Sequence, residues 1–311
     1  MHAISTRGLS KTYKNVALGD KHSLIDLTIA INEGEVFGFL GHNGAGKTTT
    51  IKILCGLVKP TAGRANVFGR DVLDHQARAA IGYLPEQPYF YEYLTPRETL
   101  EFYGRLRGRA PGERAEDWGR LTELLDLKDI AGERVKGFSK GMRQRLGFAV
   151  ALIGDPPLLI LDEPMSGLDP VGRRNIRELI LRCRDEGKTI FFSSHVLGDV
   201  EQICDRVSIL SKGCLVREGR IGQLIGDQPR GTEIIARGLD DHGRAMVMEH
   251  AKSHRRYEEQ DIFQFGPGGG PQECVRILLD RGAELVSLTP LKQSLEEFFM
   301  AEHEAQAETP S

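Results

Sequence analysis

The sequence predicts an α/β protein with a mostly parallel sheet, followed by a small α+β domain. Three observations support this prediction: four short apolar runs, helical patterns between them, and a change of pattern near residue 226. Buried strands that alternate with helices are typical of parallel sheets covered on both faces. The length of 311 residues allows two domains of roughly 150 residues each.

The first elements are predicted to be a strand, a turn and a strand–loop–helix unit. Residues 25–31 alternate between apolar and polar, which predicts a half-buried antiparallel strand. Four side chains are expected on its buried face: Ile25, Leu27, Ile29 and Ile31. A turn at 32–35 precedes the apolar run 36–40, which predicts a strand buried on both faces. Apolar residues at helical spacing follow a glycine-rich loop.

The middle of the chain is predicted to hold three more buried strands and an inserted group of helices. The strands are expected at 158–161, 189–192 and 207–210, where apolar residues run continuously. Residues 96–150 contain helical patterns and no strand. We therefore expect a helical subdomain, at about 90–155, within a first domain that spans residues 1–225.

The tail is predicted to form a small accessory domain at residues 226–301. Short strands are expected near 232–236, 262–265 and 284–288, and helices near 245–251, 273–279 and 291–300. The charged stretch 252–259 is interpreted as a solvated surface. The final residues, 302–311, are acidic and poor in apolar side chains, which predicts disorder.

Composition excludes several classes of protein. The 41 Lys and Arg residues against 44 Asp and Glu residues give a net charge of −3, so nucleic acid is not an expected partner. Five scattered cysteines without a CxxC pair predict a reduced, intracellular chain. No apolar run reaches the ~18 residues of a membrane helix and none forms a secretory signal. Any membrane role therefore requires a partner.

Residues 41–48 match the phosphate-loop pattern G-x-x-x-x-G-K-[ST] between a predicted strand and a predicted helix. Its backbone amides are expected to form an anion-binding nest. Lys47 is expected on the β- and γ-phosphates, and the Thr48 hydroxyl on Mg²⁺. The expected nucleotide-binding set is Gly41, His42, Asn43, Gly44, Ala45, Gly46, Lys47, Thr48 and Thr49.

Two carboxylates follow the apolar run 158–161. A buried strand that ends in Asp162 and Glu163 places both at the carboxyl edge of the sheet, beside the phosphate loop. Asp162 is the carboxylate expected on the Mg²⁺ side, as a ligand of the metal. Glu163 is the expected general base, which orients a water molecule toward the γ-phosphate.

In this order, the motifs of residues 3–220 resemble the ATP-binding subunits of ABC transporters. The segment 138–145 occupies the place of that family's signature motif and keeps Ser139 and Gly141 of the common LSGGQ core. Lys140 and Met142 depart from this core, in a form that looks like a variant of certain bacterial exporter ATPases. The resemblance implies a P-loop NTPase core of the ABC ATPase type, with an antiparallel β subdomain and an inserted helical subdomain.

The resemblance also implies roles for single residues. Tyr13 is placed as the aromatic side chain that stacks on adenine, although an isolated tyrosine is also common in a partial core. Gln87 is placed on Mg²⁺ and the attacking water. Asp169 belongs to the loop that signals between subunits, and His195 to the switch that contacts the γ-phosphate. Ser139 and Gly141 are implied to close over ATP bound to the opposite subunit.

The function implied by the resemblance is that of an ATP-hydrolysing energy subunit, with ATP and Mg²⁺ as cofactors. Two such chains, identical or paralogous, would form a head-to-tail dimer on a separate transmembrane permease, at the inner face of the membrane. The segment 291–299 resembles the closing motif of bacterial ATPases that serve exporters of drugs, sodium or glycoconjugates, which favours export. The same segment has the apolar spacing of an amphipathic helix, and both interpretations can hold together.

Two other functions stay open at this point. A non-transport ABC ATPase of translation would carry two nucleotide-binding units, whereas this chain has one. The DNA-repair type needs a long coiled-coil insertion, and the stretch between Gln87 and Ser139 is too short for it. An importer ATPase is disfavoured by the short C-terminal region. The transported substrate is not readable, because in this family the membrane subunit selects it.

Overall fold

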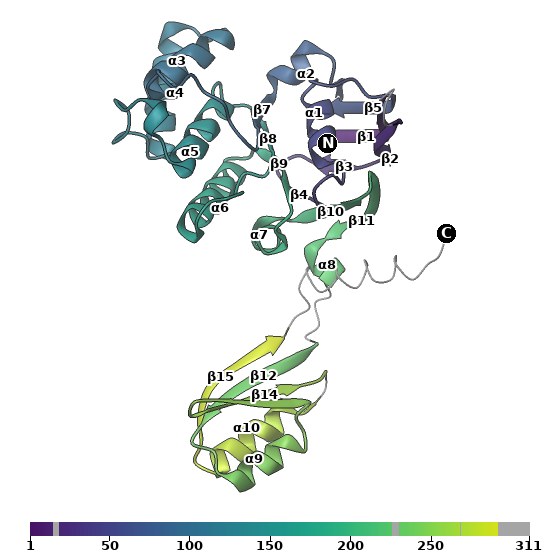
Figure 1. Ribbon diagram of the computed structural model, residues 1–311, viewed down its shortest axis with the longest axis vertical. Coiled ribbons are helices and arrows are strands. Elements are labelled where there is room, and N and C mark those ends of the chain that lie inside the picture. The colour runs from purple at the N-terminus through teal and green to yellow at the C-terminus, as the bar shows by residue number, and fades with distance from the viewer. Residues whose placement is uncertain (15–18, 226–229, 268, 292–311) are drawn as a thin grey trace. The chain divides into compact units, whose positions relative to one another are not determined.

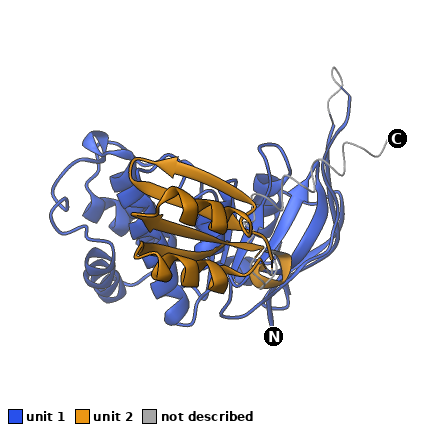
Figure 2. Cartoon of the chain, turned by 90° about the horizontal axis from the view of Figure 1, so that it is seen from below, with its two compact units in different colours: residues 1–220 blue, residues 221–311 orange. Residues whose placement is uncertain are grey.

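The computed structural model describes residues 1–14, 19–225, 230–267 and 269–291. Two compact units make up the chain, residues 1–220 and 221–311 (Figure 2). The first contains two sheets and most of the helices, and the described part of the second contains one sheet and three helices (Figure 1). No helix within the described ranges is both long and apolar enough to cross a membrane.

A six-stranded sheet forms the centre of the first unit, in the order β11-β10-β4-β9-β8-β7. Neighbouring strands are parallel except β10 and β11. The strands are β4 (Val36–Leu40), β7 (Ile81–Leu84), β8 (Leu158–Leu161), β9 (Thr189–Ser194), β10 (Arg206–Ser211) and β11 (Cys214–Arg220). Every residue of β4, β8 and β9 is buried, which confirms the predicted parallel sheet with both faces covered.

The second sheet of this unit is antiparallel throughout, in the order β2-β1-β5-β6, with β3 also paired to β1. Its strands are β1 (His2–Tyr13), β2 (Lys21–Leu27), β3 (Ala30–Asn32), β5 (Ala62–Val67) and β6 (Arg70–Asp71). The prediction of one regular strand over 25–31 is wrong. Asp26 has a φ of 51°, and this left-handed residue shifts the alternation so that Leu24 is buried and Ile25 exposed.

Helices cover the parallel sheet and form a separate group beside it. Those next to the sheets are α1 (Lys47–Leu54), α2 (His75–Ala79), α6 (Pro170–Asp185) and α7 (Leu197–Ile203), and α8 (Ile221–Ile225) opens the second unit. The group beside the sheet contains α3 (Pro96–Leu106), α4 (Pro111–Leu124) and α5 (Lys140–Ala151), with a 3₁₀ turn at Val135–Gly137 (Figure 1). Ser139 and Asp169 cap the amino ends of α5 and α6.

After α8, the second unit has the element order β-α-β-β-α-β, with an antiparallel sheet in the order β13-β14-β12-β15. Its elements are β12 (Gly231–Arg237), α9 (Asp241–Met248), β13 (Ser253–Tyr257), β14 (Gln260–Phe265), α10 (Pro271–Asp280) and β15 (Glu284–Leu291). Both helices lie on one face of the sheet (Figure 1). The core of this unit includes Ile234 and Phe263 of the sheet and Leu278 of α10.

Sequence reasoning missed β13 and misplaced α9. The stretch interpreted as a solvated surface is an edge strand whose side chains are mostly exposed. Because neither face of this strand is buried, its sequence does not alternate between apolar and polar residues. The helix expected at 245–251 begins earlier because the Asp240 side chain caps it, accepting a hydrogen bond from Gly243 N. The helix expected at 291–300 lies outside the described residues, except for Leu291, which ends β15.

Candidate nucleotide-binding site

The phosphate loop connects the carboxyl end of β4 to the start of α1. Gly44 and Gly46 have φ values of 84° and 112°, which side-chain-bearing residues rarely adopt. At Gly46 a Cβ atom would also lie 2.6 Å from the backbone oxygen of Ser23. Glycine is therefore required at position 46 both for the turn and for the close approach of β2. Within the loop, Ala45 N donates to His42 O at 3.1 Å, whereas the amides of the first turn of α1 have no partner within the helix and are available to an anion.

Lys47 extends from the first turn of α1 and is almost fully buried. Its Nζ donates a hydrogen bond to Gly41 O at 2.5 Å and lies 3.2 Å from Glu163 Oε1. The side chains of Lys47 and Glu163 are 6% and 9% exposed. A buried charge of either sign is costly unless it is paired, so each of these groups satisfies the other.

Asp162 and Glu163 follow β8 directly, and Ser193 at the end of β9 joins them. Ser193 Oγ donates to Asp162 Oδ1 at 2.7 Å and accepts from Glu163 N at 2.9 Å. Burial raises the pKa of the Asp162 carboxyl, while hydrogen bonds from Ser193 and Thr48 oppose that rise. Parallel pairing of β8 with β9 therefore positions both carboxylates.

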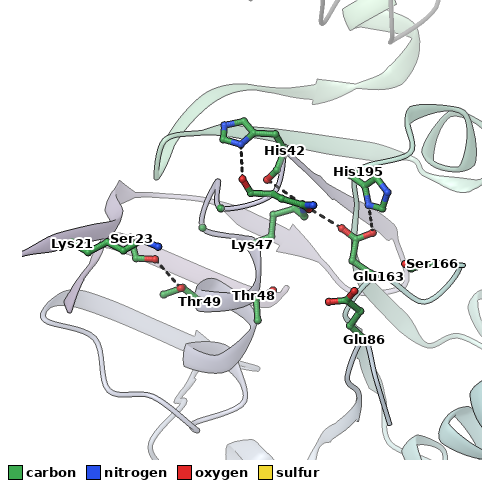
Figure 3. A pocket seen from close by; sticks show the side chains of 13 residues that line it. Lys21, Ser23, His42, Lys47, Thr48, Thr49, Glu86, Glu163, Ser166 and His195 are labelled. Carbon is green, nitrogen blue, oxygen red and sulfur yellow. Dashed lines mark hydrogen bonds and ion pairs between the residues drawn. The ribbon is translucent and has the colours of Figure 1, made fainter. Parts of the chain in front are cut away.

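Glu163 is in contact with His195 as well as Lys47. The Nδ1 atom of His195 lies 2.8 Å from Glu163 Oε2, so the carboxylate bridges the lysine and the histidine (Figure 3). Glu163 itself has a φ of 48°. A left-handed backbone at a non-glycine residue is unfavourable and is often found at functional sites.

A cavity of about 320 Å³ opens above the phosphate loop. Most of the predicted site residues line it, namely His42, Asn43, Gly44, Gly46, Lys47, Thr48, Thr49, Glu163 and His195. Gly41 contributes its carbonyl oxygen to Lys47, and Ala45 is buried beneath the loop. The structure thus gathers loop, carboxylate and histidine residues from three separate segments around one space.

Sequence reasoning missed two residues of β2 in this cavity, Lys21 and Ser23. Ser23 Oγ lies 3.0 Å from Thr49 Oγ1, which ties the antiparallel sheet to the phosphate loop. Neither residue belongs to a recognisable sequence motif. Both lie on β2, which is held in place by its pairing with β1, so only knowledge of that pairing would identify them as cavity residues.

Tyr13, Gln87 and the buried Asp162 are predicted site residues that do not line this cavity. Tyr13 is 39% exposed at the end of β1, with Lys11 Nζ 5.1 Å from its ring centre, and it pairs across the hairpin with Lys21. Gln87 is exposed, and its neighbour Glu86 lines the cavity instead.

Ser139, Gly141 and Asp169 line a second cavity of about 550 Å³. Ser139 Oγ accepts a hydrogen bond from Met142 N at 3.3 Å, and Asp169 Oδ1 accepts one from Gly172 N at 2.7 Å. The loop between β8 and α6 borders both cavities, with Ser166 in the first and Gly167 in the second. Within one chain, the segment 139–141 and the phosphate loop therefore line different cavities.

Comparison with known proteins identifies the family. Residues 24–166 match the ABC transporter family model. An uncharacterised ABC transporter ATP-binding protein from Synechocystis sp. is 40% identical over 303 residues, which cover 96% of this chain and 84% of that protein. The chain belongs to the ABC transporter family. A bacitracin transport ATP-binding protein from Bacillus licheniformis is 35% identical, over 96% of both chains.

Solved structures place the first unit among ABC ATPase cassettes. An ATP-binding subunit of an ABC transporter superposes with a TM-score of 0.64 at 32% identity, over 71% of this chain and 91% of that chain. A dimeric cassette in a post-hydrolysis state, bound to ADP and Pi, gives a TM-score of 0.64 at 25% identity, over 70% of this chain and 98% of that chain. This ABC protein is therefore an ATPase that binds ATP, of a family whose ATP-binding subunits dimerise and work with transmembrane components.

Proposed function

We propose that this ABC ATPase is the energy subunit of an exporter and acts on a separate transmembrane permease. The observation that supports this most is the match to the bacitracin transport protein, which extends over 96% of both chains. That match covers the second compact unit as well as the cassette. We assign residues 1–225 to the ATPase and residues 226–301 to an accessory domain, on the inner face of the membrane.

The cavity above the phosphate loop is lined by groups that ATP hydrolysis needs. Lys47 and the loop amides would hold the phosphates, and Glu163 would take a proton from the attacking water. Its contact with His195 would keep the carboxylate directed toward the γ-phosphate. Thr48 and Asp162 present oxygen atoms of the kind that Mg²⁺ prefers, and when bound this ion would stabilise charge on the phosphate oxygens. Gln87 would have to move inward to reach them.

Closure of a head-to-tail dimer of two such chains would join the two kinds of cavity. The segment with Ser139 and Gly141 of one chain would face the phosphate loop of the other, and Asp169 would lie at the junction. ATP favours the closed state only because it binds the two surfaces together better than either alone. Hydrolysis would then reopen the dimer and pass the change to the permease.

Export is tested by removing the protein from cells and by restoring it in two forms. A strain without it should become hypersensitive to at least one compound in a panel of toxic peptides and drugs that includes bacitracin. The unaltered protein should restore resistance, and Glu163→Gln should not. Unchanged resistance together with lost uptake of a nutrient would identify an importer instead. A defect in translation or DNA repair would support a non-transport ABC ATPase.

A further inference from the structure

Ser193 lies near the carboxyl end of β9 and is fully buried. The parallel pairing of β8 with β9 extends to Leu161 and Phe192, so Asp162 and Ser193 are the next residues of the two strands. Here the Ser193 side chain becomes the partner of the other chain segment: its Oγ accepts from Glu163 N at 2.9 Å and donates to Asp162 Oδ1 at 2.7 Å. One hydroxyl group therefore joins the backbone of Glu163 to the carboxylate of Asp162.

The backbone of Glu163 depends on this contact because the chain leaves the strand at that residue. Its φ of 48° lies in the left-handed region, which is unfavourable for a residue with a side chain. In this conformation the buried N–H of Glu163 donates to the Ser193 hydroxyl. A buried N–H without a partner is costly, so the hydrogen bond to Ser193 favours the left-handed conformation of Glu163.

The contact with Ser193 differs from the two contacts of the Glu163 carboxylate, which involve Lys47 at 3.2 Å and His195 at 2.8 Å. Both of those partners line the cavity above the phosphate loop. In the proposed function Lys47 moves to the phosphates, so its contact with Glu163 is lost when ATP binds. Ser193 is buried and does not line the cavity, so its hydrogen bond to the Glu163 backbone would persist with ATP bound.

We propose that Ser193 is a positioning residue for ATP hydrolysis, which holds Glu163 in the left-handed conformation that directs its carboxylate toward the attacking water. This inference rests on the proposed function, in which Glu163 is the general base. It goes beyond that function by assigning the orientation of the base to a buried hydroxyl outside the cavity. A general base must lie within hydrogen-bond reach of the proton that it takes, and a displacement of about 1 Å can cost on the order of a hundredfold in rate.

The test compares variants of Ser193 in the full chain, each made alone and together with Glu163→Gln. Ser193→Ala removes the hydroxyl, Ser193→Cys replaces it with a weakly hydrogen-bonding thiol, and Ser193→Thr keeps it. Ser208→Ala is the matched control, because Ser208 is also fully buried in the same sheet and its Oγ donates to the Glu218 carboxylate at 3.1 Å. ATP turnover, ATP affinity and thermal unfolding are measured for each variant.

We expect Ser193→Ala and Ser193→Cys to lower kcat by about tenfold or more, while ATP affinity stays within a few-fold of the unaltered protein. Ser193→Thr should keep most of the turnover, and Ser208→Ala should keep all of it. In the Glu163→Gln background Ser193→Ala should cause no further loss, because no base is left to orient. A loss caused by general destabilisation would instead add to that of Glu163→Gln, and Ser208→Ala would share it.

Hydrogen exchange of the Glu163 amide, followed by NMR, gives a readout that is independent of turnover. In Ser193→Ala this amide should exchange at least about tenfold faster, whereas the backbone amides within β8 and β9 should change no more than in Ser208→Ala. If Ser193→Ala and Ser193→Cys keep their turnover, or if their loss adds to that of Glu163→Gln, the assignment of Ser193 is overturned and the role of Glu163 stands. If Glu163→Gln itself keeps its turnover, the general base is overturned and this inference with it.

Discussion

Lys47 Nζ and Glu163 Oε1 lie 3.2 Å apart in a buried ion pair. The cation expected on the phosphates is thus paired with the carboxylate expected to activate water. In the proposed function, ATP binding would separate the two, because the γ-phosphate would take the position beside Lys47 that Glu163 now holds. The pair would then link nucleotide entry to release of the proposed general base, and several predictions depend on it.

Glu163→Gln should separate hydrolysis from binding. Loss of the base should lower ATP turnover on the order of a hundredfold or more. ATP affinity of the monomer should rise a few-fold, because no ion pair with Lys47 has to break. Glu86→Gln is the matched control, since Glu86 also lines the cavity but forms no ion pair with Lys47. Turnover of Glu163→Gln within a few-fold of the unaltered protein would remove Glu163 from the role of base.

Lys47→Met should reduce ATP binding and also destabilise the protein without nucleotide. The substitution leaves the buried Glu163 carboxylate with its contact to His195 but without its ammonium partner, and the loss of that partner should cost about 1–3 kcal/mol. The double variant with Glu163→Gln should recover most of that free energy of unfolding. A denaturant titration of both single variants and the double variant measures the coupling. Additive effects would show that the ion pair contributes nothing to stability.

Asp162→Asn should stabilise the protein without nucleotide and weaken its response to ATP and Mg²⁺. Burial raises the pKa of Asp162 above its unfolded value, so stability falls as pH rises from the unfolded to the folded pKa. The cost persists at neutral pH, and the neutral amide of the variant would avoid it. Thermal unfolding should show a rise of about 2 °C or more. With saturating ATP and Mg²⁺ the order should reverse, because the unaltered protein gains more from the ligand.

Tyr13 and Lys21 should both contribute to ATP affinity, through different parts of the nucleotide. Tyr13→Ala should weaken binding about tenfold through lost stacking on the base, and Tyr13→Phe should retain it. Lys21→Gln should weaken binding several-fold in a salt-dependent way, because the charged side chain of Lys21 lines the cavity above the phosphate loop. Fluorescence titration with ATP and with inorganic triphosphate distinguishes them, since only Lys21 should affect the triphosphate. Wild-type affinity in Tyr13→Ala would exclude adenine stacking.

The phosphate loop and the carboxylate pair were predictable because each is a local pattern of residues at the end of a buried strand. The contribution of Ser193, Ser23 and Lys21 was not, since strand pairing brings each of them to the site. The irregularity at Asp26 escaped prediction because a single left-handed residue changes which side chains are buried. Gln87 and Tyr13 entered through the family resemblance alone, and in this structure both stand outside the cavity.

This ATPase is proposed to drive a separate membrane protein. Affinity purification of the tagged chain from gently solubilised native membranes, followed by quantitative mass spectrometry, tests this proposal. A polytopic membrane protein should be recovered in stoichiometric amount, and also with the Glu163→Gln variant, because contacts between the subunits do not require hydrolysis. Recovery with ribosomes or DNA-repair factors and no membrane protein would contradict the transport function, while leaving the Lys47 site as a site of ATP hydrolysis.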